Sequence, residues 1–81
     1  MIEIKILGGG CAKCERLEAQ TRDVVASMGL DATFTKVKSM NEIMAYDVMT
    51  TPALVINEKV CCHGRIPDSE EIQGWLQEWA D

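Results

Sequence analysis

The sequence has few of the features that mark specialised classes of protein. Its 81 residues contain 8 basic and 13 acidic side chains, a formal net charge of −5, and no basic stripe. Nucleic-acid-binding surfaces need clustered lysine and arginine, so we expect no nucleic-acid partner. No apolar run is long enough to span a membrane. Residues 1–5 lack the charged start and long apolar stretch of a signal peptide, which predicts a cytoplasmic protein without membrane association.

Repeats, low-complexity tracts and charge blocks are also missing. A chain of this length has room for one core, so residues 1–81 are expected to form a single domain. The composition, 47% hydrophobic and 26% charged, is that of an ordinary globular protein. We expect a monomer of marginal stability, because the core is small.

Hydrophobic periodicity predicts seven elements. Alternation of apolar and polar residues predicts a strand over 2–6, and the period changes to that of a helix from Ala12 up to a capping glycine, Gly29. Strands are expected at 32–37, 53–56 and 60–63. Capping boxes at Ser39 and at Asp68 predict the starts of two more helices. The order β-α-β-α-β-β-α describes a small α/β sheet with helices on its faces, a parallel first strand pair and a final hairpin.

The spacing of apolar residues predicts which side chains of the two later helices are buried. The short helix after Ser39 is expected to bury Met40, Ile43 and Met44. The last helix carries one apolar stripe with spacing i, i+3, i+4 and i+7, made of Ile72, Trp75, Leu76 and Trp79.

Four cysteines form two close pairs, which favours catalytic or metal-binding use over a secreted disulfide framework. The first pair lies in Cys11-Ala12-Lys13-Cys14, after a strand and at the start of a helix. Helix N-termini stabilise the thiolate that attacks disulfides. Cys11 is the expected nucleophile and Cys14, one turn deeper, the resolving thiol. Gly10 is assigned to the substrate-binding part because it leaves the nucleophile without a bulky neighbour.

Other uses of the same thiols stay open. A Cys-x-x-Cys pair also occurs as buried structural thiols, as half of a zinc site, or in copper chaperones, since thiolates suit Cu(I) and Zn. A soft-metal binding module is therefore one alternative function. A redox sensor without catalytic turnover is another.

Thr51-Pro52 stands directly before the third strand and, taken alone, is an ordinary helix stop. Combined with the chain length, the element order and the Cys11–Cys14 motif, it makes the sequence resemble the thioredoxin-like proteins. The nearest resemblance is to small microbial redox-active disulfide proteins, which are of glutaredoxin size. The resemblance covers Met1 to Trp79 and is specific at residues 10–15, 17–18, 51–54, 64–65 and 70–72.

The resemblance implies an α/β thioredoxin fold, with a four-stranded mixed sheet flanked by three helices. It implies a cis peptide at Thr51–Pro52, where Thr51 presents its backbone to an extended substrate chain. The implied enzyme reduces protein disulfides, transfers electrons through the Cys11–Cys14 couple without another cofactor or a metal, and is recycled by a flavin-dependent thioredoxin-type reductase. The sequence departs from thioredoxins in having Gly10 and Ala12-Lys13 around its cysteines, and Lys5 near the place of their buried acid.

The second pair, Cys61-Cys62, is followed by the one histidine, His63. Strand alternation predicts that the two thiols point to opposite faces. They are either a second redox pair or soft-metal ligands, or else one packed and one exposed thiol on a hairpin, which is the favoured interpretation. His63 is expected to be a surface residue. The methionines Met28, Met40, Met44 and Met49 are interpreted by default as packing residues of helices and loops, and Met40, Met44 and Met49 are alternatively a soft binding surface for partners.

Overall fold

The computed structural model of the chain describes residues 1–8, 12–48 and 50–79. In chain order the elements are β1 (Ile2–Leu7), α1 (Ala12–Met28), β2 (Ala32–Val37), α2 (Met40–Met44), β3 (Ala53–Ile56), β4 (Lys59–His63) and α3 (Ser69–Gln77). The strands form one sheet in the order β2-β1-β3-β4. β1 pairs parallel with β2 and antiparallel with β3, and β3 pairs antiparallel with β4. The predicted element order and the mixed four-stranded sheet are confirmed.

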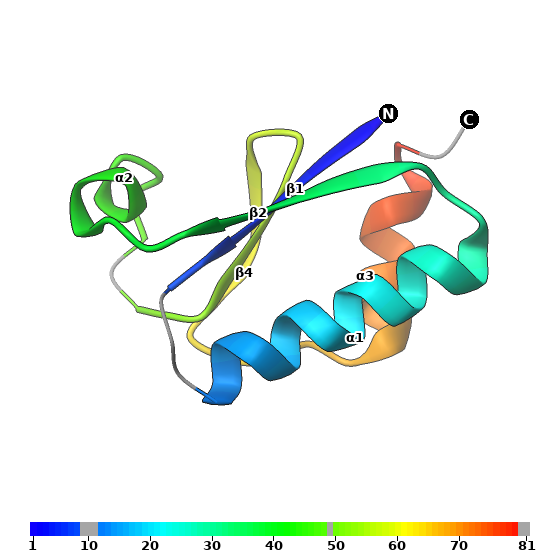
Figure 1. Cartoon of the computed structure of the whole chain (residues 1–81), viewed down its shortest axis with the longest axis horizontal. Coiled ribbons are helices and arrows are strands. Elements are labelled where there is room, and N and C mark those ends of the chain that lie inside the picture. The colour runs from blue at the N-terminus through cyan, green and yellow to red at the C-terminus, as the bar shows by residue number, and fades with distance from the viewer. Residues whose placement is uncertain (9–11, 49, 80–81) are drawn as a thin grey trace.

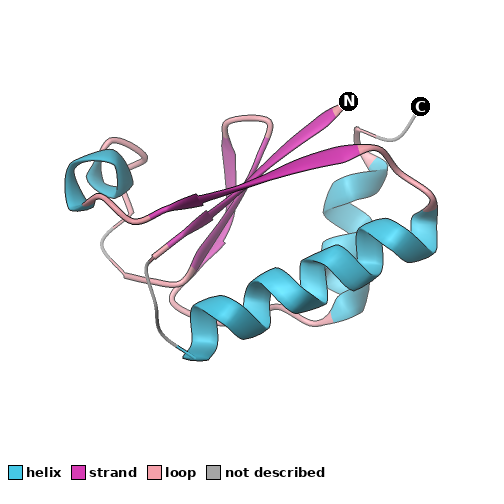
Figure 2. Ribbon diagram, in the orientation of Figure 1, coloured by secondary structure: helices cyan, strands magenta, loops and turns pink. Residues whose placement is uncertain are grey.

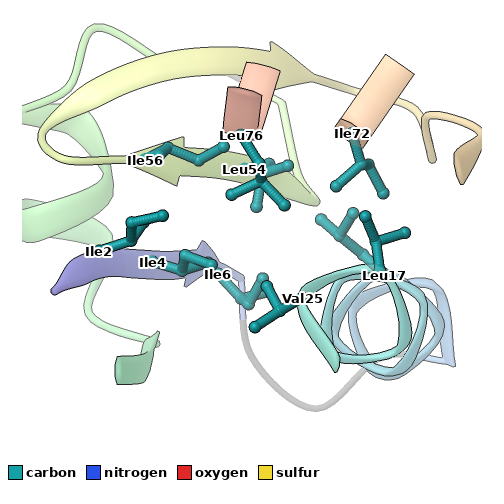
Figure 3. Packing of buried hydrophobic residues seen from close by; sticks show 10 residues of the cluster. Ile2, Ile4, Ile6, Leu17, Val25, Leu54, Ile56, Ile72 and Leu76 are labelled. Atoms are coloured by element: carbon teal, nitrogen blue, oxygen red, sulfur yellow. The ribbon is translucent and has the colours of Figure 1, made fainter. Parts of the chain in front are cut away.

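The longer helices, α1 and α3, lie together on one face of the sheet, as Figure 1 shows. The main core lies between these helices and the strands and consists of ten buried apolar residues. Figure 3 shows their side chains. It is built from Ile2, Ile4, Ile6, Leu17, Val24, Val25, Leu54, Ile56, Ile72 and Leu76. Alternation explains the contribution of β1, because side chains two residues apart point to the same face.

The short helix α2 lies away from α1 and α3, beyond one end of the sheet (Figure 2). A smaller cluster of buried residues faces it, namely Leu7, Val37, Ile43, Val48, Ala53 and Val55. Only Ile43 of α2 is buried, whereas Met40 and Met44 are 66% and 59% exposed. The prediction that all three are buried was therefore wrong for the methionines. A helix this short at the end of a sheet turns one side chain inward and leaves its neighbours in solvent.

The ends of the helices agree with the predicted caps in two cases out of three. Asp68 and Glu71 form the reciprocal capping box at the start of α3. Gly29 ends α1 with φ +67°, a conformation that costs glycine little. Ser39 stands at the start of α2 but makes no side-chain capping bond, so the capping box predicted there is absent. Trp79 lies beyond the end of α3 and is 39% exposed, which shortens the predicted apolar stripe.

A two-residue turn, Asn57-Glu58, joins β3 to β4. Both residues have positive φ, at 49° and 69°, the geometry that matches the twist of a tight hairpin. Asn57 Oδ1 also accepts a hydrogen bond from the backbone N–H of Glu3, at 2.9 Å. None of the helices in the described ranges combines the length and hydropathy needed to cross a membrane.

The register of β4 contains a bulge that the sequence did not reveal. Leu54 is paired with Cys62 and Val55 with Val60, so Cys61 is an extra residue with no partner on β3. Cys61 packs against the main core, and Cys62 stands opposite Leu54 of that same core. The bulge therefore turns both thiols toward the face of α1 and α3, and the predicted alternation of Cys61 and Cys62 was wrong.

Candidate functional site

The candidate site lies at the end of β1, where the chain passes into α1. Cys14 stands in the first turn of α1 and is only 5% exposed. The chain before it has the sequence Gly8-Gly9-Gly10-Cys11, and the predictions for Gly10 and Cys11 fall outside the described residues. The position of Cys14 within the first turn of the helix, shielded from solvent, is the one expected for a resolving thiol.

Gly8 brings two other segments together around Cys14. It has φ +121° and is buried. A Cβ on Gly8 would lie 2.8 Å from Cys14 Sγ and 3.1 Å from Thr51 Cβ. Such a contact with sulfur is too close for any side chain, so only glycine lets the thiol and Thr51 approach the same point of the backbone. The sequence signal was the run of three glycines, which was expected to leave the nucleophile without bulky neighbours. The contact of Gly8 with the resolving thiol was not predicted.

Thr51 and Pro52 form the other wall of the site. The Thr51–Pro52 peptide bond is cis, the isomer that the resemblance implies. Pro52 is buried, while Thr51 is exposed. The structure thus brings together three of the predicted positions, Cys14, Thr51 and Pro52, from two segments 37 residues apart in the sequence, counted from 14 to 51.

A cavity of about 80 Å³ adjoins both Cys14 and Gly8. Its lining is partly polar and includes Glu15, Lys36 and Lys38. Lys36 forms an ion pair with Glu18 at 3.0 Å, and this contact lowers the pKa of the Glu18 carboxyl. A space of this size holds several water molecules.

An apolar groove of about 190 Å³ ends at Thr51. It is lined by Met40, Ile43, Met44, Val48 and Thr51. The exposed methionines of α2 therefore border the same residue that stands beside Cys14, while Met49, the third residue of the predicted surface, lies outside the described residues. Methionine side chains are flexible and polarisable, which suits a surface that adapts to different apolar partners.

The Thr50–Pro52 segment is attached to the end of β4. Thr50 Oγ1 lies 3.1 Å from His63 Nδ1, and the backbone N–H of Gly64 donates to the carbonyl oxygen of Pro52 at 2.9 Å. His63 is exposed, as predicted. Its proximity to the cis-proline segment was not predicted, because β-strand pairing across the hairpin determines it.

The thiols of the second cysteine pair make different hydrogen bonds. Cys62 is 7% exposed and its Sγ donates to the carbonyl oxygen of Arg65 at 3.4 Å, while Cys61 Sγ donates to that of Lys59 at 3.6 Å. Burial raises the pKa of both thiols, which disfavours the reactive thiolate. Within residues 1–8, 12–48 and 50–79, no group of three or more His, Cys, Asp and Glu side chains is arranged to hold a metal ion. The soft-metal alternative gains no support from this part of the chain.

Solved structures with the same architecture identify the fold. The germline-specific thioredoxin Deadhead of Drosophila melanogaster matches with a TM-score of 0.68 at 13% identity, over 98% of this chain and 81% of that one. The oxidised thioredoxin of Plasmodium falciparum matches with a TM-score of 0.63 at 13% identity, over 99% and 82% of the two chains. The chain has the thioredoxin fold.

Sequence relatives identify the family. A family model described as a thioredoxin domain matches residues 2–77. A thioredoxin of Methanothermobacter thermautotrophicus is 37% identical over 73 residues, covering 90% of this chain and 95% of that one. A thioredoxin of Methanocaldococcus jannaschii is 33% identical over 81 residues, covering 100% and 93%. The chain belongs to the thioredoxin family, and its activity is that of a protein thiol–disulfide oxidoreductase.

Proposed function

We propose that the protein reduces protein disulfides, with Cys11 as the attacking thiolate and Cys14 as the resolving thiol. The observation that carries this proposal is the placement of Cys14. Its sulfur lies in the first turn of α1, buried against Gly8 and beside Thr51 of the cis-proline segment. A partner thiol three residues earlier precedes the first turn of the helix, where unpaired backbone N–H groups favour a negative charge.

The proposed reaction balances in two steps. The Cys11 thiolate attacks one sulfur of the substrate disulfide, and the other substrate sulfur leaves as a thiolate that takes up a proton. Cys14 then loses its proton and its thiolate attacks the Cys11 sulfur of the mixed disulfide. The bond from Cys11 to the substrate breaks, the second substrate sulfur leaves as a thiolate that takes up a proton, and a Cys11–Cys14 disulfide remains. The substrate has gained two electrons and the protein has lost them.

The environment of Cys14 supports its part in the second step. Burial protects the thiol from oxidants and from unrelated disulfides. The adjoining cavity of about 80 Å³ gives water a place beside the sulfur that must lose its proton. Glu15 and Lys38 line the same cavity, so the departing proton meets a polar environment.

The surface around Thr51 supports binding of an extended protein chain. Thr51 is exposed next to the buried thiol, and its backbone is the proposed partner for substrate main chain, as in strand addition. The groove lined by Met40 and Met44 is the proposed site for an apolar side chain of that substrate. A flavin-dependent thioredoxin-type reductase is the proposed electron donor, and the cytoplasm the proposed location.

Trapping of the mixed disulfide tests the proposal. A Cys14→Ser variant, reacted with a protein disulfide such as insulin, is expected to remain linked to its substrate through Cys11, because the resolving attack is lost. Mass spectrometry of the digested adduct identifies the linked cysteine. Cys62→Ser is the matched control, another buried cysteine of the same chain, and is expected to turn over insulin without accumulating an adduct.

Two results contradict the proposed roles. One is an adduct through Cys61 or Cys62 in the Cys14→Ser variant. The other is reduction of insulin by Cys11→Ser at the rate of the unaltered protein, since that variant lacks the proposed nucleophile.

A further inference from the structure

The end of β4 holds the segment that borders the buried thiol. His63 is the last residue of β4 and pairs with Ala53, the first residue of β3. Its Nδ1 lies 3.1 Å from Oγ1 of Thr50, two residues before the cis-proline. Gly64, the next residue, donates its N–H to the carbonyl oxygen of Pro52. The three-residue segment is thus attached at both ends, and Thr51 lies between the attachments.

Close packing of the backbone makes this arrangement specific. Gly64 has φ +77°, and a Cβ there would stand 2.8 Å from Thr50 Oγ1. Because Gly64 has no side chain, there is room beside it for the Thr50 hydroxyl, which contacts the imidazole of His63. The segment is also packed closely against Gly8, because a Cβ on Gly8 would lie 3.1 Å from Thr51 Cβ.

The imidazole of His63 contributes little to the fold itself. His63 and Thr50 are both exposed, so their removal creates neither a cavity nor a buried polar group without a partner. The hydrogen bond between them acts on the orientation of Thr50, and through the chain on the backbone of Thr51. We therefore assign this exposed hydrogen bond to the positioning of the substrate-facing segment rather than to the stability of the sheet.

We propose that His63 is a positioning residue for protein substrates, whose Nδ1 holds Thr50 so that the Thr51 backbone faces the incoming chain. This inference rests on the proposed function, because it concerns how that substrate is bound. His63 touches neither the thiols nor the reacting sulfur atoms in the proposed reaction. Its effect therefore falls on binding of extended protein chains, and a small disulfide that makes no backbone contacts does not depend on it.

Steady-state kinetics with two substrates tests the assignment. His63→Ala is expected to raise KM for insulin by about two- to tenfold, the range for one lost hydrogen bond, with kcat nearly unchanged. The rate with 2-hydroxyethyl disulfide is expected to equal that of the unaltered protein. Thr50→Val is expected to reproduce the same pattern, and the double variant to be no worse than either single one.

Conservative variants show which nitrogen matters. The amide of asparagine reaches about as far as Nδ1, so His63→Asn is expected to restore a KM close to that of the unaltered protein. The longer His63→Gln places its amide where Nε2 stands and is expected to behave like His63→Ala. Thr35→Val, at an exposed threonine on the far edge strand β2, is the matched control for Thr50→Val and is expected to change nothing.

The outcomes separate this inference from the function on which it rests. An unaltered protein that does not reduce insulin contradicts the proposed function. Normal activity of the unaltered protein together with an unchanged KM in His63→Ala overturns the inference alone. It is also overturned if His63→Ala slows the small disulfide as much as insulin, or if His63→Asn fails to rescue. Urea unfolding of each variant is expected to give midpoints close to the original, and a large fall in His63→Ala would show a structural role instead.

Discussion

The two faces of the sheet are built differently. The face under α1 and α3 is closed by ten buried apolar residues contributed by two strands, β1 and β3, and the two helices. The other face has a six-residue apolar cluster next to α2, and farther along β1 it carries Lys5. Lys5 Nζ donates to Tyr46 Oη at 2.8 Å and pairs with Glu58 at 2.5 Å, while Tyr46 Oη donates to Glu58 at 2.8 Å.

One face of the sheet therefore stabilises the fold, and the other leaves the candidate site accessible to a substrate. The closed face has enough apolar contact to hold two helices on the sheet, so most of the folding free energy is expected there. The open face has one short helix, and that helix keeps its methionines in solvent beside Thr51. A charged and aromatic network replaces hydrophobic packing on the remainder of that face. The candidate redox site lies where β1 ends and β3 begins, between the two kinds of surface.

The largest expected effect comes from opening the closed face. Ile72 of α3 is fully buried in the main core. Ile72→Ala should lower the free energy of unfolding by about 2–5 kcal/mol, because the lost burial is joined by a residual cavity. Urea denaturation measures this as a lower midpoint at constant slope. A loss below about 1 kcal/mol would show that α3 is not a main support of the sheet.

A change at the junction of the two faces is expected to affect stability and activity together. Gly8→Ala introduces a methyl group 2.8 Å from Cys14 Sγ at a φ of +121°. We expect a loss of about 1–3 kcal/mol from overpacking and backbone strain, and a slower release of substrate from the mixed disulfide. Gly74→Ala is the matched control, since a methyl group there meets nothing within 4 Å. Equal behaviour of the two variants would contradict the described packing of Cys14.

A moderate effect is expected on the open face. Ile43 is the buried residue of α2, and Ile43→Val removes one methyl group from the smaller cluster. The expected cost is about 0.5–1.5 kcal/mol, less than for Ile72→Ala. Hydrogen exchange should show faster opening of α2 with little change in α1. Equal acceleration in both helices would mean that the two faces unfold as one unit.

The smallest effect is expected from the exposed network of Lys5, Tyr46 and Glu58. The hydrogen bond from Lys5 is the main cause that lowers the pKa of Glu58 below its ordinary value of 4.5, and Tyr46 adds to it. A carboxyl with a lower pKa in the folded state stabilises the fold above the unfolded value, and this contribution is lost as the pH falls through the folded value. Lys5 behaves oppositely, because Glu58 and Tyr46 raise its pKa above 10.5 and its contribution is lost only at very alkaline pH.

Titration of stability with acid checks this network. The stability difference between the unaltered protein and Glu58→Gln should be present at neutral pH and shrink below pH 4.5. Glu58 is exposed and Lys5 is only partly buried, so salt should reduce the difference as well. A constant difference from pH 3 to 7 would exclude an electrostatic origin.

Local patterns in the sequence predicted the architecture well. Alternation of Ile2, Ile4 and Ile6 placed β1, and the change of period at Ala12 placed the start of α1, because burial on one face imposes these spacings. The Asp68–Glu71 box placed the start of α3. The thiol of Cys14 and the Thr51-Pro52 pair were found from sequence, since short motifs carry them.

Features that depend on contacts between distant segments were missed. Nothing in the residues themselves distinguishes the Ser39 cap, which is not formed, from the Asp68 cap, which is. The burial of Met40 and Met44 was overestimated because helical spacing does not tell how much of a helix meets the sheet. Gly8 lies close to Cys14, and His63 close to Thr50, because the fold brings separate segments together. Local periodicity in the sequence gives no information about such contacts.

The bulge in β4 has a consequence for how this hairpin tolerates change in length. Since Cys61 has no counterpart on β3, a chain from which that one residue is deleted keeps Val60 facing Val55 and Cys62 facing Leu54. The tight turn at Asn57-Glu58 would be untouched, and regular pleating would simply resume. A one-residue deletion elsewhere in the hairpin exchanges its inward and outward sides, whereas this position can be gained or lost without shifting the rest.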